Sequence, residues 1–82
     1  MDLEKLGIAQ IQPPDPEDSD PRPRLIVDGY GIHAGQGFSA LLPDGWHDIT
    51  LEVAYNKIGP ESWYISTPEY RSISPIGLFV KI

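Results

Sequence analysis

Two histidines, His33 and His47, are the side chains of this chain best suited to move protons or bind a metal near neutral pH. Carboxylates that could assist them lie close by in the sequence: Asp28, Asp44 and Asp48. Such chemistry needs a spacing that directs the groups to one point, and the chain has no HxH or HxxxH pair and no carboxylate–histidine pair on one predicted element. We therefore expect no metal site. His33 is predicted to bond the backbone of its glycine-rich turn, and His47 to be solvated.

Other groups that could catalyse a reaction are also missing. The chain has no cysteine, which excludes a thiol nucleophile, a thiolate metal site and disulfide bonds. No serine lies in the context of a nucleophile elbow. The possible carboxylate pairs, Asp44 with Asp48 and Glu61 with Glu69, fall in turns or on solvated faces, where acids are ordinary. The sequence therefore predicts a protein that is not an enzyme and that carries no cofactor.

Four glycines in a short stretch give the composition of a phosphate-binding loop: Gly29, Gly31, Gly35 and Gly37. Such a loop holds phosphate with backbone amides at a helix N-terminus, whereas the segment that follows here has the pattern of a strand. We interpret these glycines as a tight connection with residues in left-handed conformations before that strand.

Aromatic side chains are the stronger indication of function, because this small chain has four tyrosines and two tryptophans. Neighbouring residues of a strand point to opposite faces, so a buried Trp63 would direct Tyr64 outward. An exposed aromatic cluster can bind a peptide or a protein, and the candidate residues are Trp46, Tyr55, Tyr64 and Tyr70. The alternative is that the tyrosines shield a thin core while their hydroxyls stay in water.

The charge of the chain selects between partners. There are 12 Asp and Glu against 6 Lys and Arg, a net charge of −6. Small barrels that bind single-stranded nucleic acid need a basic groove beside their aromatics, so this charge disfavours nucleic acid. It favours a protein partner with a basic surface, and the acidic residues predicted to bind it are Asp15, Glu17, Asp18 and Asp20.

These acids lie in an N-terminal segment of unusual composition, residues 1–24, with five prolines: Pro13, Pro14, Pro16, Pro21 and Pro23. Proline lacks the backbone donor that a helix or a central strand needs, so we expect an extended or disordered arm that orders on docking. At its start, Leu3, Leu6 and Ile11 could form one apolar turn or a short strand. Residues 25–82 are predicted to form the folded domain.

Residues 25–82 have the pattern of short strands joined by turns. The clearest signal is the alternation of apolar and polar residues from Trp46 to Tyr55. Further strands are predicted at 25–27, 38–42, 63–65 and 78–82, with turns at 43–45 and 56–60. The predicted fold class is all-β, an SH3-like partly open barrel or a curled antiparallel meander of about five strands. Its predicted core comprises Ile26, Phe38, Ala40, Leu42, Ile49, Leu51, Val53, Trp63, Ile65, Leu78 and Val80.

Residues 30–82 also contain a series of short motifs in a characteristic order. They are Ile32-His33-Ala34-Gly35, Asp44-Gly45-Trp46, Thr50-Leu51-Glu52, Ser62-Trp63-Tyr64-Ile65 and Gly77-Leu78-Phe79-Val80-Lys81-Ile82. This order resembles the family called domain of unknown function 5348, short bacterial proteins often associated with mobile elements. The resemblance implies a small barrel and an origin in a mobile element or phage, and the family carries no established activity. Ala34 stands where the family usually has a cysteine, which argues against a thiol or metal role at that turn.

Taken together, these features predict a non-catalytic protein–protein interaction module, an acidic small β-barrel. One alternative is an inhibitor that mimics nucleic acid and occupies the binding groove of a host defence protein. Another alternative is a barrel that binds single-stranded nucleic acid. No apolar run approaches the ~20 residues of a membrane helix and the start of the chain lacks a signal-peptide pattern, so we expect a cytoplasmic protein that does not bind membranes.

Overall fold

The computed structural model describes residues 6–82, and within that range it contains strands and single-turn 3₁₀ helices but no α-helix. The predicted all-β class is confirmed. No helix among these residues has the length and apolar character needed to cross a bilayer. Leu3 lies outside the described residues. The elements are, in chain order, β1 (Ile8–Gln10), β2 (Ile26–Val27), β3 (Tyr30–Gly31), β4 (Gly37–Leu42), β5 (Gly45–Val53), η2 (Pro60–Ser62), β6 (Trp63–Ile65), η3 (Pro68–Tyr70) and β7 (Phe79–Lys81).

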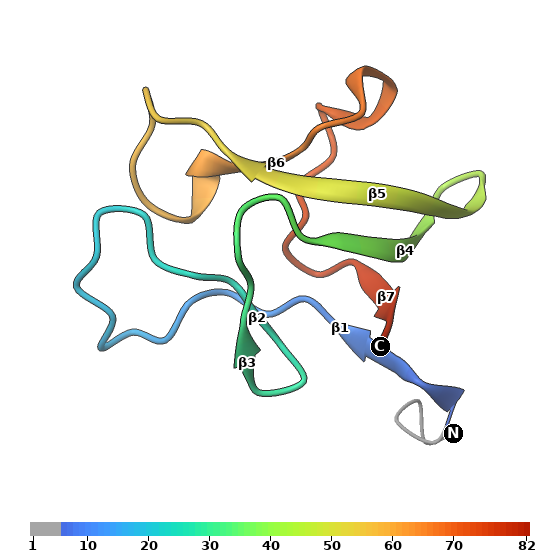
Figure 1. The fold of residues 1–82 in the computed structure, drawn as a ribbon, viewed down its shortest axis with the longest axis horizontal. Helices are drawn as coiled ribbons and strands as arrows, with labels where there is room; N and C mark the ends of the chain where they lie inside the picture. The colour runs from blue at the N-terminus through green and yellow to red at the C-terminus, as the bar shows by residue number, and fades with distance from the viewer. Residues whose placement is uncertain (1–5) are drawn as a thin grey trace.

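Five of the strands form one antiparallel sheet in the order β1-β7-β4-β5-β6, while β2 and β3 form a separate hairpin (Figure 1). Only β4, β5 and β6 follow one another as a meander. Strand β7 returns to the far side of β4, and β1 adds beside β7, with Gln10 opposite Phe79. The edge strands β1 and β6 do not pair with each other, so the sheet is open rather than closed into a barrel.

The β2–β3 hairpin and the segments on either side of it are hydrogen-bonded near both edges of the open sheet. Gln12 and Ile26 exchange two backbone hydrogen bonds, 3.1 and 2.7 Å long, which attach β2 to the continuation of β1. The Gly35 amide donates to the Leu51 carbonyl at 2.7 Å, which attaches the segment after β3 to the middle of β5. The hairpin thus buries apolar surface that a closing strand pair would bury in a barrel.

Turn chemistry explains both hairpins. Asp28 and Gly29 connect β2 to β3 with φ of 51° and 80°, the left-handed pair that suits a tight two-residue connection. The predicted turn at 43–45 is also present, with Gly45 at a φ of 121°. The interpretation of the glycines is correct for Gly29 and Gly35, which have positive φ.

Most of the predicted core is confirmed. The buried residues among them are Ala40, Leu42, Ile49, Leu51, Trp63, Ile65 and Val80, while Phe38, Val53 and Leu78 are partly buried and pack against them. The prediction for β2 is wrong by one residue: Leu25 and Val27 are buried in place of Ile26, since a shift of one position along a strand exchanges its faces. Ile11 and Ile32 complete the core and were not predicted.

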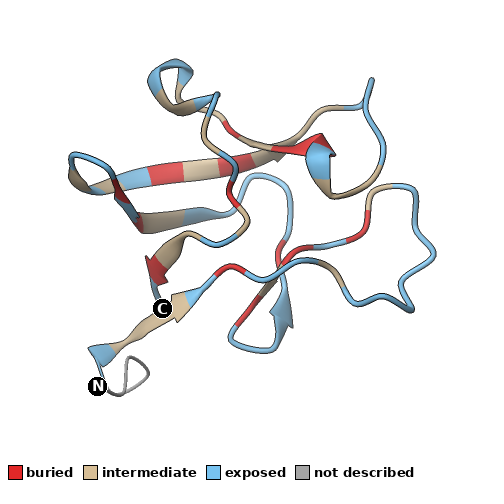
Figure 2. Ribbon diagram, turned by 180° about the vertical axis from the view of Figure 1, so that it is seen from behind, coloured by how far each residue is buried: buried red, intermediate tan, exposed pale blue. Residues whose placement is uncertain are grey.

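The proline-rich segment is extended, and the short strand that the sequence allows before it is present as β1. Strand β1 belongs to the sheet and Ile11 to the core, so residues 13–24 form a loop that is attached at both ends. The Trp63 Nε1–H donates to the buried Pro23 carbonyl at 2.9 Å, and the Gly59 amide donates to the Pro21 carbonyl at 2.6 Å. Most of the loop is exposed (Figure 2). Apolar residues on either side of the prolines supply the burial that the prolines and acids cannot.

Candidate functional site

The four aromatic residues predicted to bind a partner fall in two separate places. Tyr55 and Tyr64 lie near the C-terminal end of β5, whereas Trp46 and Tyr70 lie near its N-terminal end, at the β4–β5 turn. Trp46 is the second residue of β5 and Val53 is its last, a separation of roughly 23 Å along an extended strand. The structure therefore brings together one pair of the predicted aromatics, Tyr55 with Tyr64.

These two tyrosines line an open hollow of about 460 Å³, which we call the tyrosine groove; its lining residues are Val53, Ala54, Tyr55, Asn56, Lys57, Glu61, Tyr64 and Arg71. As predicted, Tyr64 lies on the face of β6 opposite the buried Trp63 and Ile65, and is half-buried. The alternation that predicts β5 extends to Tyr55. Strand β5 ends at Val53 instead, so Tyr55 lies in a turn and is 80% exposed.

Each tyrosine of the groove is covered by an arginine. The Arg71 guanidinium carbon lies 5.7 Å from the centroid of the Tyr64 ring, and that of Arg22 lies 5.3 Å from the centroid of the Tyr55 ring. Arg22 also donates from Nη2 to the Tyr55 carbonyl. Cation and ring attract each other through the charge distribution of the π-system, so each contact favours one orientation of the tyrosine ring.

A smaller hollow of about 200 Å³ adjoins the groove, because Val53 and Tyr55 line both. Arg22, Arg24 and His33 also line this adjoining hollow, and no acidic residue does. The backbone packs tightly here: a Cβ built on Gly31 would lie 3.0 Å from the Arg24 side chain, so glycine lets β3 approach that arginine.

The predicted acidic residues form part of the exposed loop at 13–24, and three of them have a local structural role. Oδ1 of Asp15 accepts from the Glu17 amide at 2.9 Å, and Oδ1 of Asp18 accepts from the Asp20 amide at 3.0 Å. Asp20 repeats the pattern with the Arg22 amide at 3.0 Å. These Asx turns replace backbone bonds that a proline-rich segment cannot make, so the aspartates shape the loop.

At the other end of β5, Asp44 connects two side chains. Its Oδ1 lies 3.1 Å from His47 Nε2, and the Tyr70 hydroxyl donates to its Oδ2 at 3.4 Å. The rings of His47 and Tyr70 lie 5.6 Å apart. Partial desolvation, the charges of Asp44 and Glu69 and the bond to Asp44 raise the pKa of the Tyr70 hydroxyl. The cluster attaches η3 to the β4–β5 turn. The His47 side chain contacts Asp44 and the Tyr70 ring and is not surrounded by solvent alone.

Trp46, the fourth predicted aromatic, is 36% exposed and lies under the Lys81 ammonium, 4.8 Å from its nitrogen. Its neighbour across the hairpin is Leu41. Neither residue lines any part of the tyrosine groove.

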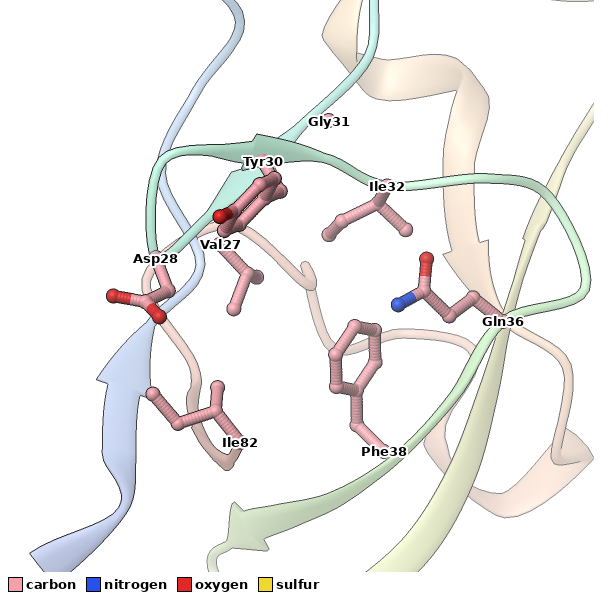
Figure 3. A pocket seen from close by; sticks show the side chains of 8 residues that line it. All are labelled: Val27, Asp28, Tyr30, Gly31, Ile32, Gln36, Phe38 and Ile82. Atoms are coloured by element: carbon pink, nitrogen blue, oxygen red, sulfur yellow. The ribbon is translucent and has the colours of Figure 1, made fainter.

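Figure 3 shows a third hollow, of about 270 Å³, beneath the β2–β3 hairpin. Val27, Ile32, Phe38 and Ile82 direct apolar side chains toward it, and the Asp28 carboxylate points away. This hollow offers apolar contact but little charge, whereas the tyrosine groove combines rings with cations. Among residues 6–82, no group of three or more His, Asp or Glu side chains is arranged to hold a metal ion.

Comparison of the chain with family models, with curated proteins and with solved structures finds no match. The candidate site is therefore defined by its geometry. Sequence reasoning identified Tyr55 and Tyr64 but missed the arginines. Arg22 and Tyr55 are 33 positions apart and meet only because the proline-rich loop returns to the turn after β5. No local pattern encodes such a contact.

Proposed function

We propose that the protein is a non-catalytic protein–protein interaction module that binds a short segment of its partner in the tyrosine groove. The observation that carries this proposal is the pair Tyr55 and Tyr64, each with an arginine guanidinium over its ring, beside an open hollow of about 460 Å³. Tyrosine and arginine are enriched among the residues that contribute most to protein interfaces. A hollow of this size can accept a few side chains of a peptide.

Preorganisation strengthens the argument. A tyrosine has few rotatable bonds, so it loses little conformational entropy when a partner covers it. The stacked guanidinium groups of Arg22 and Arg71 restrict the two rings further before any partner arrives. The alternative, that the tyrosines only shield the core, fits Tyr64 in part but not Tyr55, which is 80% exposed.

The proposal can be tested by selecting binders from a random-peptide phage library on the immobilised protein. We expect enriched peptides whose binding shifts the NMR amide signals of Tyr55, Tyr64 and Arg71. Tyr55→Ala should abolish most of the binding while leaving the fold intact, because this side chain is exposed. Tyr30→Ala is the matched control: Tyr30 is 76% exposed but lies on β3, away from the groove. Absence of enriched peptides, or equal loss in both variants, would refute the proposal.

A further inference from the structure

Most of the cations that the structure describes in this acidic protein gather at one place. The structure describes five Lys and Arg side chains, and four of them line the tyrosine groove or its adjoining hollow: Arg22, Arg24, Lys57 and Arg71. The fifth, Lys81, lies over Trp46. Among residues 6–82, the one acid that lines either hollow is Glu61. We call these four cations together the cationic face.

The charges of the cationic face are not neutralised by ion pairs. Within residues 6–82 the single close contact between a basic and an acidic side chain is that of His47 with Asp44, so no described carboxylate forms a salt bridge with an arginine or lysine. Glu52 is the cross-strand neighbour of Tyr64, but its Oε1 lies 3.8 Å from where a Cβ of Gly35 would be, and it does not line the groove. The Arg71 guanidinium carbon instead lies 5.7 Å from the centroid of the Tyr64 ring, a cation–π contact that does not neutralise the positive charge.

Most of the other described acids lie outside the lining of the two hollows. Four are in the loop at 13–24, Asp28 is in the β2–β3 turn, and Asp44 and Asp48 are near the β4–β5 turn. Glu52 is paired with Tyr64 across the strands, and Glu69 lies in η3. Among the described residues that line the two hollows, four cations stand against one acid, so the sign of this lining charge is opposite to that of the net charge of −6. A ligand at short range meets mainly the local charges, because salt screens interactions beyond about 8 Å.

We infer that the partner segment bound in the tyrosine groove is an acidic peptide, whose Asp or Glu carboxylates meet Arg71 and Lys57 while an apolar side chain packs on Tyr55 and Tyr64. This inference rests on the proposed function and specifies its partner. Arginine N–H groups at the edge of a stacked guanidinium match the two oxygens of a carboxylate. The partner is thus the opposite of the basic surface that the composition predicts.

A peptide fits this site better than a nucleic acid does. A single strand carries a phosphate on every nucleotide and needs a basic path along its whole length. Here the cationic face is short, and the acidic loop at 13–24 lies next to it. The Gly59 amide, which follows the turn after β5, donates to the Pro21 carbonyl near the end of that loop. Figure 1 shows the loop and this turn projecting from the same side of the molecule. A long polyanion would meet these carboxylates, whereas a short acidic segment ends before it reaches them.

Fluorescence anisotropy with three labelled probes tests the inference on the full chain. The probes are a short peptide of Glu, Asp, Leu and Phe, the same peptide with Gln and Asn for its acids, and a short oligodeoxythymidine. We expect the acidic peptide to bind, the amide peptide to bind at least about tenfold more weakly, and the oligonucleotide not to bind. Raising NaCl from about 50 to about 500 mM should weaken the binding of the acidic peptide.

Variants locate the contact. Arg71→Gln and Lys57→Gln should each lower the affinity for the acidic peptide about tenfold, the effect of losing one charge-assisted hydrogen bond. Lys81→Gln, which removes the cation outside the cationic face, should have no effect. Equal binding of the acidic and amide peptides, equal effects of all three variants, or stronger binding of the oligonucleotide would each overturn the inference.

The two proposals fail in different ways. If the library selection yields peptides that bind at Tyr55 but contain no acids, the groove is a protein-binding site and the acidic partner is wrong. If no peptide from the library or among the probes binds at Tyr55, the proposed function itself is wrong, and the acidic partner with it.

Discussion

The guanidinium of Arg71 lies over the ring of Tyr64, with 5.7 Å between the guanidinium carbon and the ring centroid. Tyr64 is the middle residue of β6, and Arg71 follows η3, so the contact folds the segment after the strand back over its exposed face. Lys81 over Trp46 and Arg22 over Tyr55 repeat the relationship at two other places. In a chain with few cations, most of those described are used to cover aromatic rings rather than to neutralise carboxylates.

These contacts should contribute to recognition more than to stability. Because Arg71 is exposed and water solvates its charge well, we expect Arg71→Gln to lower the free energy of unfolding by less than about 1 kcal/mol. Urea denaturation followed by circular dichroism measures this change. Lys81→Gln is the matched control, because it removes the cation that lies over Trp46. A loss of stability well above that value in Arg71→Gln alone would mean that the arginine supports the fold.

Trp63 should matter to stability in a way that Trp46 does not. Its Nε1–H donates to the buried Pro23 carbonyl, and replacement by Phe would leave that carbonyl without a partner. We expect Trp63→Phe to cost about 1–3 kcal/mol of unfolding free energy, the penalty for an unsatisfied buried group. Trp46→Phe, at a partly exposed position, should change stability by less than about 0.5 kcal/mol. Equal effects in urea denaturation would contradict the role given to the Trp63 hydrogen bond.

The sequence predicts those parts of the fold that depend on neighbouring residues. Alternation along β5 identifies the buried faces of Ile49 and Leu51, and Pro43 with Asp44 marks the hairpin turn, because side-chain direction and turn geometry are local properties. The order of the strands does not follow in this way. Gln10 pairs with Phe79 across almost the whole chain, and no propensity or period encodes that partner.

The candidate site also has one part that local sequence predicts and one part that it does not. Strand alternation is enough to direct Tyr64 outward once Trp63 is buried. The cationic face is not visible in the sequence, because its members come from the proline-rich loop, the turn after β5 and the segment after η3. A net charge averages over these places, so it does not report the excess of cations that the lining of the two hollows contains.

The N-terminal segment offers a direct test of the loop described above. Ile11 is 1% exposed and belongs to the core, whereas a free arm would leave it in water. We expect Ile11→Ala to lower the free energy of unfolding by about 2–4 kcal/mol, as other truncations of buried isoleucines do. Ile58→Ala, at a position that is 70% exposed, removes the same atoms and should cost less than about 0.5 kcal/mol. Equal stability of the two variants in urea would show that the segment is not packed on the sheet.

Tyr70 gives the protein a pH dependence in the alkaline range. Partial desolvation, the charges of Asp44 and Glu69 and the hydrogen bond to Asp44 raise its pKa in the folded state. In the unfolded chain a tyrosine ionises near pH 10, so above that pH the unfolded state binds fewer protons than the folded state. The contribution of Tyr70 to stability is therefore fully present below about pH 10 and is lost as the pH rises through the folded-state pKa.

Two measurements check this direction. The difference in unfolding free energy between the wild type and Tyr70→Phe should be constant at neutral pH and should move in favour of the phenylalanine variant above about pH 10. Titration of Tyr70 by ¹³Cζ NMR should show a midpoint above the usual one, and Asp44→Asn should move that midpoint down, because the variant removes one of the charges that oppose ionisation. A midpoint that Asp44→Asn leaves unchanged would mean that Asp44 does not act on the hydroxyl in solution, and the attachment of η3 to the hairpin turn would lose its support.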